Sequence, residues 1–190
     1  RLIDCVGYMV EGAAGHMEED VERMVKTPWF DYEIPFTQAA ELGTDKVMND
    51  HSTIGLVVTT DGSFGEIPRS NYLEAEEKTI LALKKLRKPF LVLVNSQKPY
   101  SEDAKRTAAE IGEKYGVSAV TVNCEQLKKD DIHMLLENVL YEFPISSMEF
   151  YMPKWVEMLP NDNSMKIDLI EKVKLLMKDY STIRDVLDNP

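Results

Sequence analysis

The chain has 190 residues, of which 44% are apolar, and a formal net charge of −11 at pH 7. This length allows one domain with an appendage, and the apolar share is sufficient for a hydrophobic core. The acidic balance argues against a nucleic-acid partner, because binding to a phosphate backbone needs clustered Lys and Arg.

The opening run, residues 1–7, is predicted to be a β-strand that the chain enters in mid-strand. Its sequence is Arg-Leu-Ile-Asp-Cys-Val-Gly, so Asp4 stands three residues before Gly7. D-x-x-G at a strand end is typical of P-loop nucleotidases, in which the carboxylate reaches Mg²⁺ and the glycine N–H approaches the γ-phosphate. The pattern alone is weak, because an aspartate at a strand end more often begins a turn.

Residues 8–35 form a long acidic segment without a helical or strand pattern. Loops of this length are usually functional or disordered. The aromatic end of the segment, at Trp29, Phe30 and Tyr32, indicates that part of it packs.

Three later runs are continuously apolar, as expected for parallel strands covered on both faces. They are residues 54–58, 90–94 and 119–122. Between and after them, apolar residues at helical spacing predict helices over residues 36–50, 75–86, 104–115 and 132–143. This alternation predicts an α/β fold, in which a parallel sheet lies between two layers of helices.

Two of these helices carry capping signals. Ser101 is the expected N-cap of the third, with Gly116 at its end. Asn71 and Glu74 have capping-box spacing before the second.

The C-terminal part has a different composition. Pro144 closes the fourth helix, and we predict the domain boundary there, with an α/β domain over 1–144 and a linker and helical extension over 145–190. An apolar stripe in the extension repeats at heptad spacing and needs cover from the domain, from chain outside this sequence or from a second copy. The stripe consists of Leu169, Val173, Leu176, Tyr180 and Ile183.

Asn95 follows the second continuous run, in the sequence Val-Asn-Ser-Gln-Lys. GTPases carry N-K-x-D at this position, and its Asp accepts two hydrogen bonds from guanine. Here Lys98 replaces that Asp, so guanine selectivity should be lost. A plain turn after the strand explains Asn95 equally well.

No G-x-x-x-x-G-K-[ST] motif occurs in the 190 residues, so nothing here would cradle the α- and β-phosphates. Either the protein is no nucleotidase, or this loop precedes Arg1, which the mid-strand start favours. Cys5 and Cys124 are expected to be reduced and buried, and the three histidines show no zinc spacing. No apolar stretch of membrane-spanning length and no signal-peptide pattern is found, which predicts a cytoplasmic protein.

Several segments resemble the stage IV sporulation protein A family of endospore-forming bacteria. They include residues 1–8, 27–30 and 34–36, His-Ser-Thr-Ile-Gly at 51–55, Thr-Thr-Asp-Gly at 59–62, Lys-Pro-Phe at 88–90 and Tyr-Glu-Phe-Pro at 141–144. The resemblance implies a P-loop GTPase-like (TRAFAC-type) domain, truncated at its N-terminus, that uses ATP and Mg²⁺. Asp4 would then be the Walker B carboxylate that holds the metal, Gly7 the γ-phosphate partner, and Asn95 a remnant of the base-binding motif.

The resemblance also implies a biological role. Members are morphogenetic ATPases that polymerise on the forespore surface, in the mother-cell cytoplasm, as the base layer of the spore coat. Their partners are further copies, other coat proteins and a small amphipathic peptide that anchors the layer to the membrane. This chain alone, without a P-loop, would be inactive. A non-hydrolysing scaffold with a vestigial nucleotide site remains the alternative.

Overall fold

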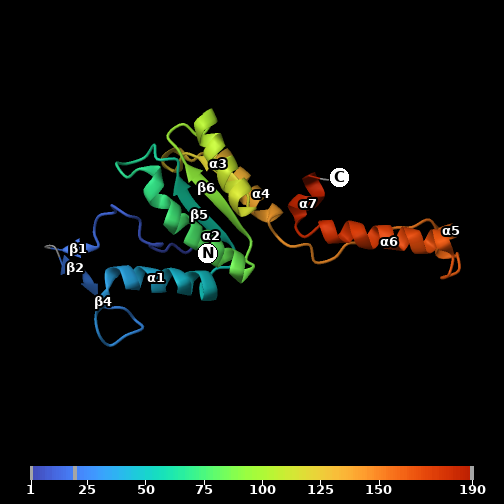
Figure 1. Ribbon diagram of the computed structural model, residues 1–190, viewed down its shortest axis with the longest axis horizontal. Coiled ribbons are helices and arrows are strands. Elements are labelled where there is room, and N and C mark those ends of the chain that lie inside the picture. Colours follow the sequence, from blue (N-terminus) through green and yellow to red (C-terminus); the bar gives the residue numbers. More distant parts are fainter. Residues whose placement is uncertain (1, 19–20, 189–190) are drawn as a thin grey trace. The chain divides into compact units, whose positions relative to one another are not determined.

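The computed structural model describes residues 2–18 and 21–188. It consists of two units, Arg1–Leu135 and Leu136–Pro190, each of which is described by itself (Figure 1). The first unit contains a parallel β-sheet with flanking helices, and the second is helical.

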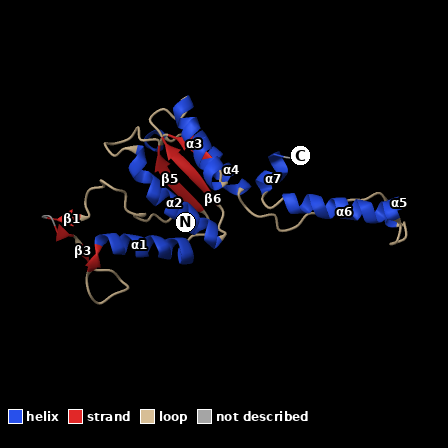
Figure 2. Ribbon diagram, in the orientation of Figure 1, coloured by secondary structure: helices blue, strands red, loops and turns tan. Residues whose placement is uncertain are grey.

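The sheet of the first unit has three strands, in the order β5-β6-β7 (Figure 2). They are β5 (Gly55–Thr60), β6 (Phe90–Asn95) and β7 (Ala119–Val122), and both pairs are parallel. The register places Thr60 opposite Asn95 and Asn95 opposite Val122, so the three carboxyl ends lie along one edge. The central strand β6 is buried from Phe90 to Val94, which explains its uninterrupted apolar sequence.

The helices alternate with the strands, as the sequence predicts. They are α1 (Phe36–Lys46), which continues into a π-helical turn η1 (Val47–His51), α2 (Leu73–Leu86) after a 3₁₀ turn η2 (Arg69–Tyr72), α3 (Glu102–Tyr115), a 3₁₀ turn η3 (Cys124–Gln126) and α4 (Lys129–Tyr141). One core cluster joins the sheet to α2 and α3 through Val57, Val92, Val94, Ile80, Leu83, Ala108, Ile111 and Tyr115. The predicted α/β class, with a parallel sheet and flanking helices, is confirmed.

One capping prediction is confirmed and the other is wrong. The Ser101 hydroxyl accepts a hydrogen bond from the Ala104 N–H at 3.2 Å, and Gly116 ends α3 with a φ of 59°. Helix α2, however, begins at Leu73 without a side-chain cap. The Asn71 amide instead donates to the Glu11 carbonyl at 3.0 Å, because the intervening 3₁₀ turn moves it off the helix start.

The predicted opening strand is also wrong within the described residues. Residues 2–16 contain no strand, and Leu2 and Val6 are 91% and 65% exposed. A strand needs a neighbour to satisfy its backbone, and no described strand pairs with this segment. The strands described between residues 17 and 35 have two residues each: β1 (Met17–Glu18) pairs with β2 (Val21–Glu22), and β3 (Met24–Val25) pairs with β4 (Ile34–Pro35).

The outer edge of β5 is unpaired in the described part of the chain. Two alternate side chains of this strand, Leu56 and Val58, are 45% and 60% exposed. One face of β5 is therefore uncovered, although its sequence is that of a buried parallel strand.

The second unit contains the end of α4 and the helices α5 (Lys154–Glu157), α6 (Ser164–Asp179) and α7 (Ile183–Asp188). An isolated bridge between Pro144 and Thr182, together with an ion pair between Arg184 and Glu142 at 2.6 Å, fixes α7 beside the end of α4. No side chain of α6 is buried. The expected heptad stripe is interrupted, because α6 ends at Asp179 and Tyr180 is extended. None of the described helices is long and apolar enough to cross a membrane.

Candidate functional site

The loops that follow the three strands meet at the carboxyl edge of the sheet, where open α/β sheets bind their ligands. The Asn95 side-chain oxygen accepts the Cys124 N–H at 2.9 Å, which ties the loop after β6 to the loop after β7. The Ser63 hydroxyl accepts the Gln97 N–H at 2.9 Å, which ties the loop after β5 to the loop after β6. The three loops thus form one hydrogen-bonded rim.

A hollow of about 380 Å³ opens beside this rim. It lies at the ends of β6 and β7, next to the first turn of α4, and its polar lining includes Lys98, Ser101, Thr121, Asn123, Lys128 and Asp131. Two of its lining residues are bonded to each other, since the Thr121 hydroxyl donates to the Pro99 carbonyl at 2.6 Å. The hollow has both cationic and anionic groups at its wall.

Asp61 shapes the loop after β5. Its carboxylate accepts hydrogen bonds from the Ser63 N–H at 2.9 Å and from the Ser63 hydroxyl. Burial pushes the pKa of Asp61 up, but hydrogen bonds from Ser63 and Ser96 outweigh burial and hold the pKa below its ordinary value. With Gly62 at a φ of 87°, this geometry is that of a tight turn stabilised by an ionised aspartate.

Arg69 also holds the loop after β5 in place. Its guanidinium donates to the Thr59 hydroxyl at the end of β5 and pairs with the buried carboxylate of Glu76 on α2. The strand end, the loop and the helix are therefore one rigid assembly.

The opening segment places Asp4 and Gly7 separately from the rim. Asp4 is exposed and makes no hydrogen bond or ion pair with the residues that the structure describes. The Gly7 N–H donates to the Thr44 hydroxyl of α1 at 3.0 Å, and Gly7 has a φ of 84°, which favours glycine. Among the described residues, no hydrogen bond or ion pair joins Asp4 or Gly7 to Asn95, and the nucleotide roles of all three stay predictions.

The described residues do not make a complete metal or phosphate site. No group of three or more His, Cys, Asp or Glu side chains among them could hold a metal ion. Of the predicted site residues, Asp4 alone has a carboxylate, and a single carboxylate needs further ligands to hold Mg²⁺.

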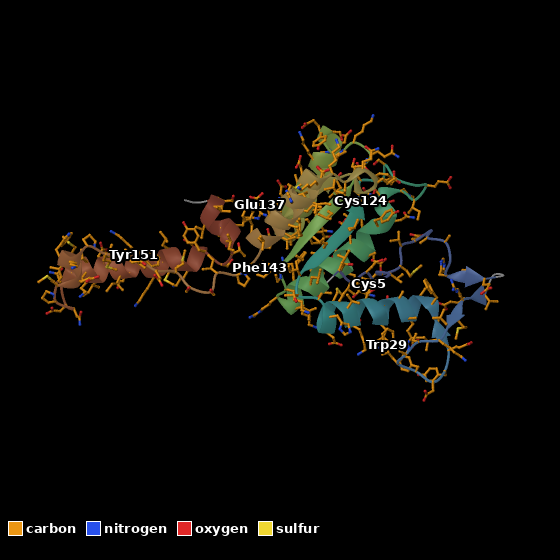
Figure 3. The ribbon with its side chains drawn as sticks, turned by 180° about the vertical axis from the view of Figure 1, so that it is seen from behind. Cys5, Trp29, Cys124, Glu137, Phe143 and Tyr151 are labelled. Atoms are coloured by element: carbon orange, nitrogen blue, oxygen red, sulfur yellow. The ribbon has the colours of Figure 1, made fainter. Side chains whose placement is uncertain are left out.

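The two cysteines, labelled in Figure 3, are both free. Cys5 is exposed, so its predicted burial is wrong, because the run that contains it is not a strand. Cys124 is half-buried, and burial raises the pKa of its thiol, which makes it a poor nucleophile at neutral pH.

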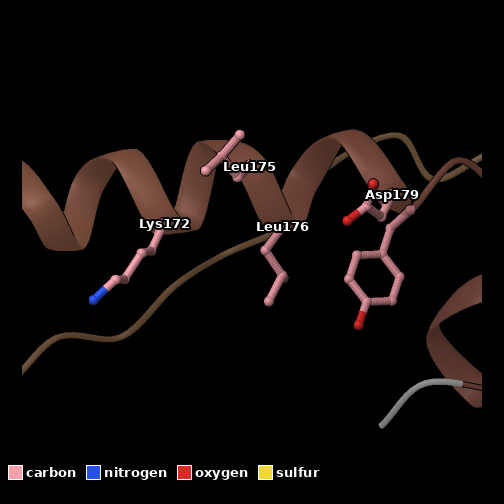
Figure 4. Close-up of a pocket in the computed structure, with 5 residues that line it drawn as sticks. Lys172, Leu175, Leu176 and Asp179 are labelled. Carbon is pink, nitrogen blue, oxygen red and sulfur yellow. The ribbon is translucent and has the colours of Figure 1, made fainter.

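A second hollow, of about 440 Å³, lies on α6 (Figure 4). It is lined by Lys172, Leu175, Leu176, Asp179 and Tyr180. Most of its lining comes from one helix, with apolar side chains between an ammonium and a carboxylate. Such a lining is typical of an exposed helix surface. In a catalytic site, by contrast, several polar groups converge on one point.

Two family models match the chain. The model described as stage IV sporulation protein A, ATPase domain, matches residues 1–144, and the model of the middle domain of the same protein matches residues 145–189. The chain belongs to the stage IV sporulation protein A family.

Curated relatives of the stage IV sporulation protein A family agree with this assignment. The proteins of that name from Bacillus subtilis (strain 168), Bacillus anthracis and Clostridioides difficile (strain 630) are 42%, 41% and 45% identical to the chain over 186 residues. The matches cover 98% of the chain but only 38% of each relative. No solved structure matches the chain.

No local sequence pattern marks the residues that hold Gly7 and the rim in place. Thr44, which holds the Gly7 amide, lies in the interior of a helix, where nothing in the local sequence marks it. The Arg69–Glu76 pair joins residues from different elements. The glutamate in the first turn of α2 would have been a signal only if its burial had been foreseen.

Proposed function

We propose that this chain is part of a magnesium-dependent ATPase whose nucleotide cycle serves self-assembly. The assembled layer would lie on the forespore surface, in the mother-cell cytoplasm, and would form the base of the spore coat. Its expected partners are further copies, other coat proteins and a small amphipathic membrane-anchoring peptide. The observation that carries the proposal is the match of residues 1–144 to the ATPase domain of a sporulation protein family.

The fold supports this proposal. The carboxyl edge of the sheet has the linked loops that a nucleotide site needs, and Asn95 holds the loop after β7 in place. Lys98, which stands where GTPases have their guanine-binding Asp, lines the hollow beside that edge. A cation there cannot accept hydrogen bonds from guanine, which agrees with use of ATP.

The uncovered face of β5 supports the proposal, because a further strand could pair with β5 there. Leu56 and Val58 are exposed on a strand whose outer edge is unpaired among the described residues. The proposal expects the phosphate-binding strand to pair there and its following helix to cover these side chains. With a phosphate-binding loop between that strand and helix, Asp4 would hold Mg²⁺ directly or through water, and the metal would offset charge on the phosphates.

Substitution of Asp4 tests the enzymatic part. In the full-length protein, Asp4→Ala should abolish ATP hydrolysis while circular dichroism and the melting temperature stay unchanged, because the side chain is exposed and makes no described contact. Asp162→Ala, which removes an exposed carboxylate of the second unit, is the control and should hydrolyse ATP normally. Normal turnover in the Asp4 variant would end the assignment.

The alternative is a scaffold that assembles without hydrolysis. Sedimentation of the full-length protein with and without ATP separates the two proposals. A nucleotide-driven protein should pellet only with hydrolysable ATP, and the Asp4→Ala variant should stay in solution. Equal pelleting under all conditions would favour the scaffold.

A further inference from the structure

One face of α6 combines two exposed leucines with one charge of each sign. Lys172, Leu175, Leu176 and Asp179 stand at positions i, i+3, i+4 and i+7, the spacing that places residues on one side of a helix. All four line the hollow on this helix (Figure 4). Leu175 and Leu176 are 59% and 45% exposed, so the described residues leave this face largely uncovered.

Both charges of this face are available to a further partner. Lys172 pairs with Asp168 at 2.8 Å within the helix, but both side chains are largely exposed, so the pair contributes little to stability. An ammonium has three hydrogens, so Lys172 can also bind a second acceptor. The Asp179 carboxylate makes no hydrogen bond or ion pair with the residues that the structure describes.

The arrangement of these four residues is self-complementary. Lys172 lies three positions before Leu175, and Asp179 lies three positions after Leu176. A second copy of the helix, turned end for end about the midpoint between the leucines, therefore brings its own Asp179 opposite Lys172 and its own Lys172 opposite Asp179. The leucines of the two copies meet at the midpoint. Such a contact is isologous, because the same patch serves both copies, and the ion pair occurs twice.

The distribution of charge also favours α6 as a contact between copies. The chain has a net charge of −11, so two copies repel each other on the whole. Helix α6 carries four lysines against three acidic side chains, so it is close to neutral. Two copies can therefore approach each other at α6 with little electrostatic cost.

We propose that α6 binds the α6 of a second copy in antiparallel orientation, with Leu175 and Leu176 at the centre and a Lys172–Asp179 ion pair on either side. One face of a 16-residue helix buries much less than a standard stable interface, which buries about 1,600 Å². The contact is therefore weak alone and forms where other contacts hold many copies together. Being isologous, it links two copies but cannot extend a polymer. This inference deepens the proposed self-assembly and rests on it.

Disulfide cross-linking of the assembled full-length protein tests the contact. In the antiparallel pair each Leu176 faces its counterpart, so Leu176→Cys should form a covalent dimer with oxidised glutathione, seen on a non-reducing gel. Lys174→Cys is the matched control, because Lys174 is exposed and lies on the opposite side of the same helix. This control should form no more dimer than the unmodified protein. Equal dimer formation by the two cysteine variants would refute the contact.

Charge reversal tests the orientation of the two helices. In the Leu176→Cys protein, Lys172→Glu and Asp179→Lys each turn both ion pairs into like-charge contacts, so each should slow cross-linking about tenfold. A mixture of these two variants should recover the rate, because each supplies the charge that the other lacks. Lys178→Glu reverses an exposed charge away from this face and should leave the rate unchanged. Absence of recovery in the mixture overturns the antiparallel pairing.

The outcomes separate the contact from the function on which it rests. Assembly with ATP, but without cross-linking of Leu176→Cys above its control, refutes the contact and leaves the proposed function intact; another surface then covers α6. Failure of the unmodified protein to assemble refutes the proposed function, and the contact falls with it. If Leu176→Cys itself does not assemble, Leu175→Cys, whose position also faces its counterpart, decides by the same comparison.

Discussion

The guanidinium of Arg69 pairs with the carboxylate of Glu76 through two nitrogens, at 2.7 Å from Nη1 to Oε2 and 2.9 Å from Nη2 to Oε1. Nη1 also lies 3.0 Å from the Thr59 hydroxyl. The glutamate side chain is only 2% exposed, so its charge is compensated inside the protein and not by water. The pair joins β5, its following loop and α2 at the edge where ligands are expected.

Arg69→Met should destabilise the protein strongly, because it leaves the Glu76 carboxylate buried without its partner. We expect a loss of about 3 kcal/mol in the free energy of unfolding, measured by urea denaturation. Arg106→Met is the control, since the pair of Arg106 with Asp103 is largely exposed and should contribute less than about 1 kcal/mol. Equal losses in the two variants would contradict the role given to burial.

Gly62→Ala and Gly65→Ala should separate backbone strain from steric contact. Both glycines have positive φ, at 87° and 73°, so either substitution should cost roughly 1–2 kcal/mol. A Cβ at Gly62 would also lie 3.2 Å from the Arg69 backbone nitrogen, whereas one at Gly65 would meet nothing within 4 Å. Urea unfolding should therefore rank Gly62→Ala as the more damaging, and the reverse order would refute the contact.

Lys88→Met should loosen the end of the π-helical turn η1. The Lys88 ammonium donates to the carbonyls of Met48, Asn49 and Ser52, so one side chain binds three carbonyls in and just after the turn. We expect a loss of about 1–2 kcal/mol in unfolding free energy. Hydrogen exchange should become faster at residues 47–55. Lys85→Met removes an exposed charge from α2 and should leave both measurements unchanged.

Asp185 should titrate well below an ordinary aspartate. It accepts hydrogen bonds from the backbone N–H groups of Thr182 and Ser181 at 2.7 and 2.8 Å, and these lower its pKa to about 2. Because the folded pKa lies below the unfolded value of about 3.8, the charged carboxylate stabilises α7 fully above that value. This stabilisation is lost as the pH falls through 3.8 toward 2.

The carboxyl carbon of Asp185, followed by NMR, checks this prediction. A midpoint near pH 2 is expected in the unmodified protein. Thr182→Val, which removes the hydroxyl half of this reciprocal cap, should move the midpoint upward. A midpoint near 3.8 in the unmodified protein would show that the cap does not form in solution.

The strands and the opening segment show what the sequence could and could not predict. Strand β6 was predictable because it is buried on both faces, so that burial alone dictates a continuous apolar run. The run at residues 2–7 is apolar apart from Asp4 and Gly7, but a strand also needs a partner, and pairing depends on residues far away in the chain. The Gly7–Thr44 bond spans 37 positions for the same reason, and no local pattern marks it.

Local signals succeeded where the local geometry is self-contained. Ser101 and Gly116 were placed correctly, because a cap involves only the neighbouring turn. Asn71 has the right spacing for a cap, but its side-chain amide donates to the Glu11 carbonyl of the loop before β1 instead. The roles of Asp4, Gly7 and Asn95 in nucleotide binding stay predictions, since no contact among the described residues tests them.

Helix α6 has 16 residues and no buried side chain. A helix of this length is only marginally stable in water on its own sequence, and most helices of folded proteins draw their stability from packing. Its amide protons should therefore exchange with deuterium rapidly whenever the helix is solvated, and slowly once another surface covers Leu175 and Leu176. The exchange rate of α6 would therefore report whether this helix is packed against another surface or exposed to solvent.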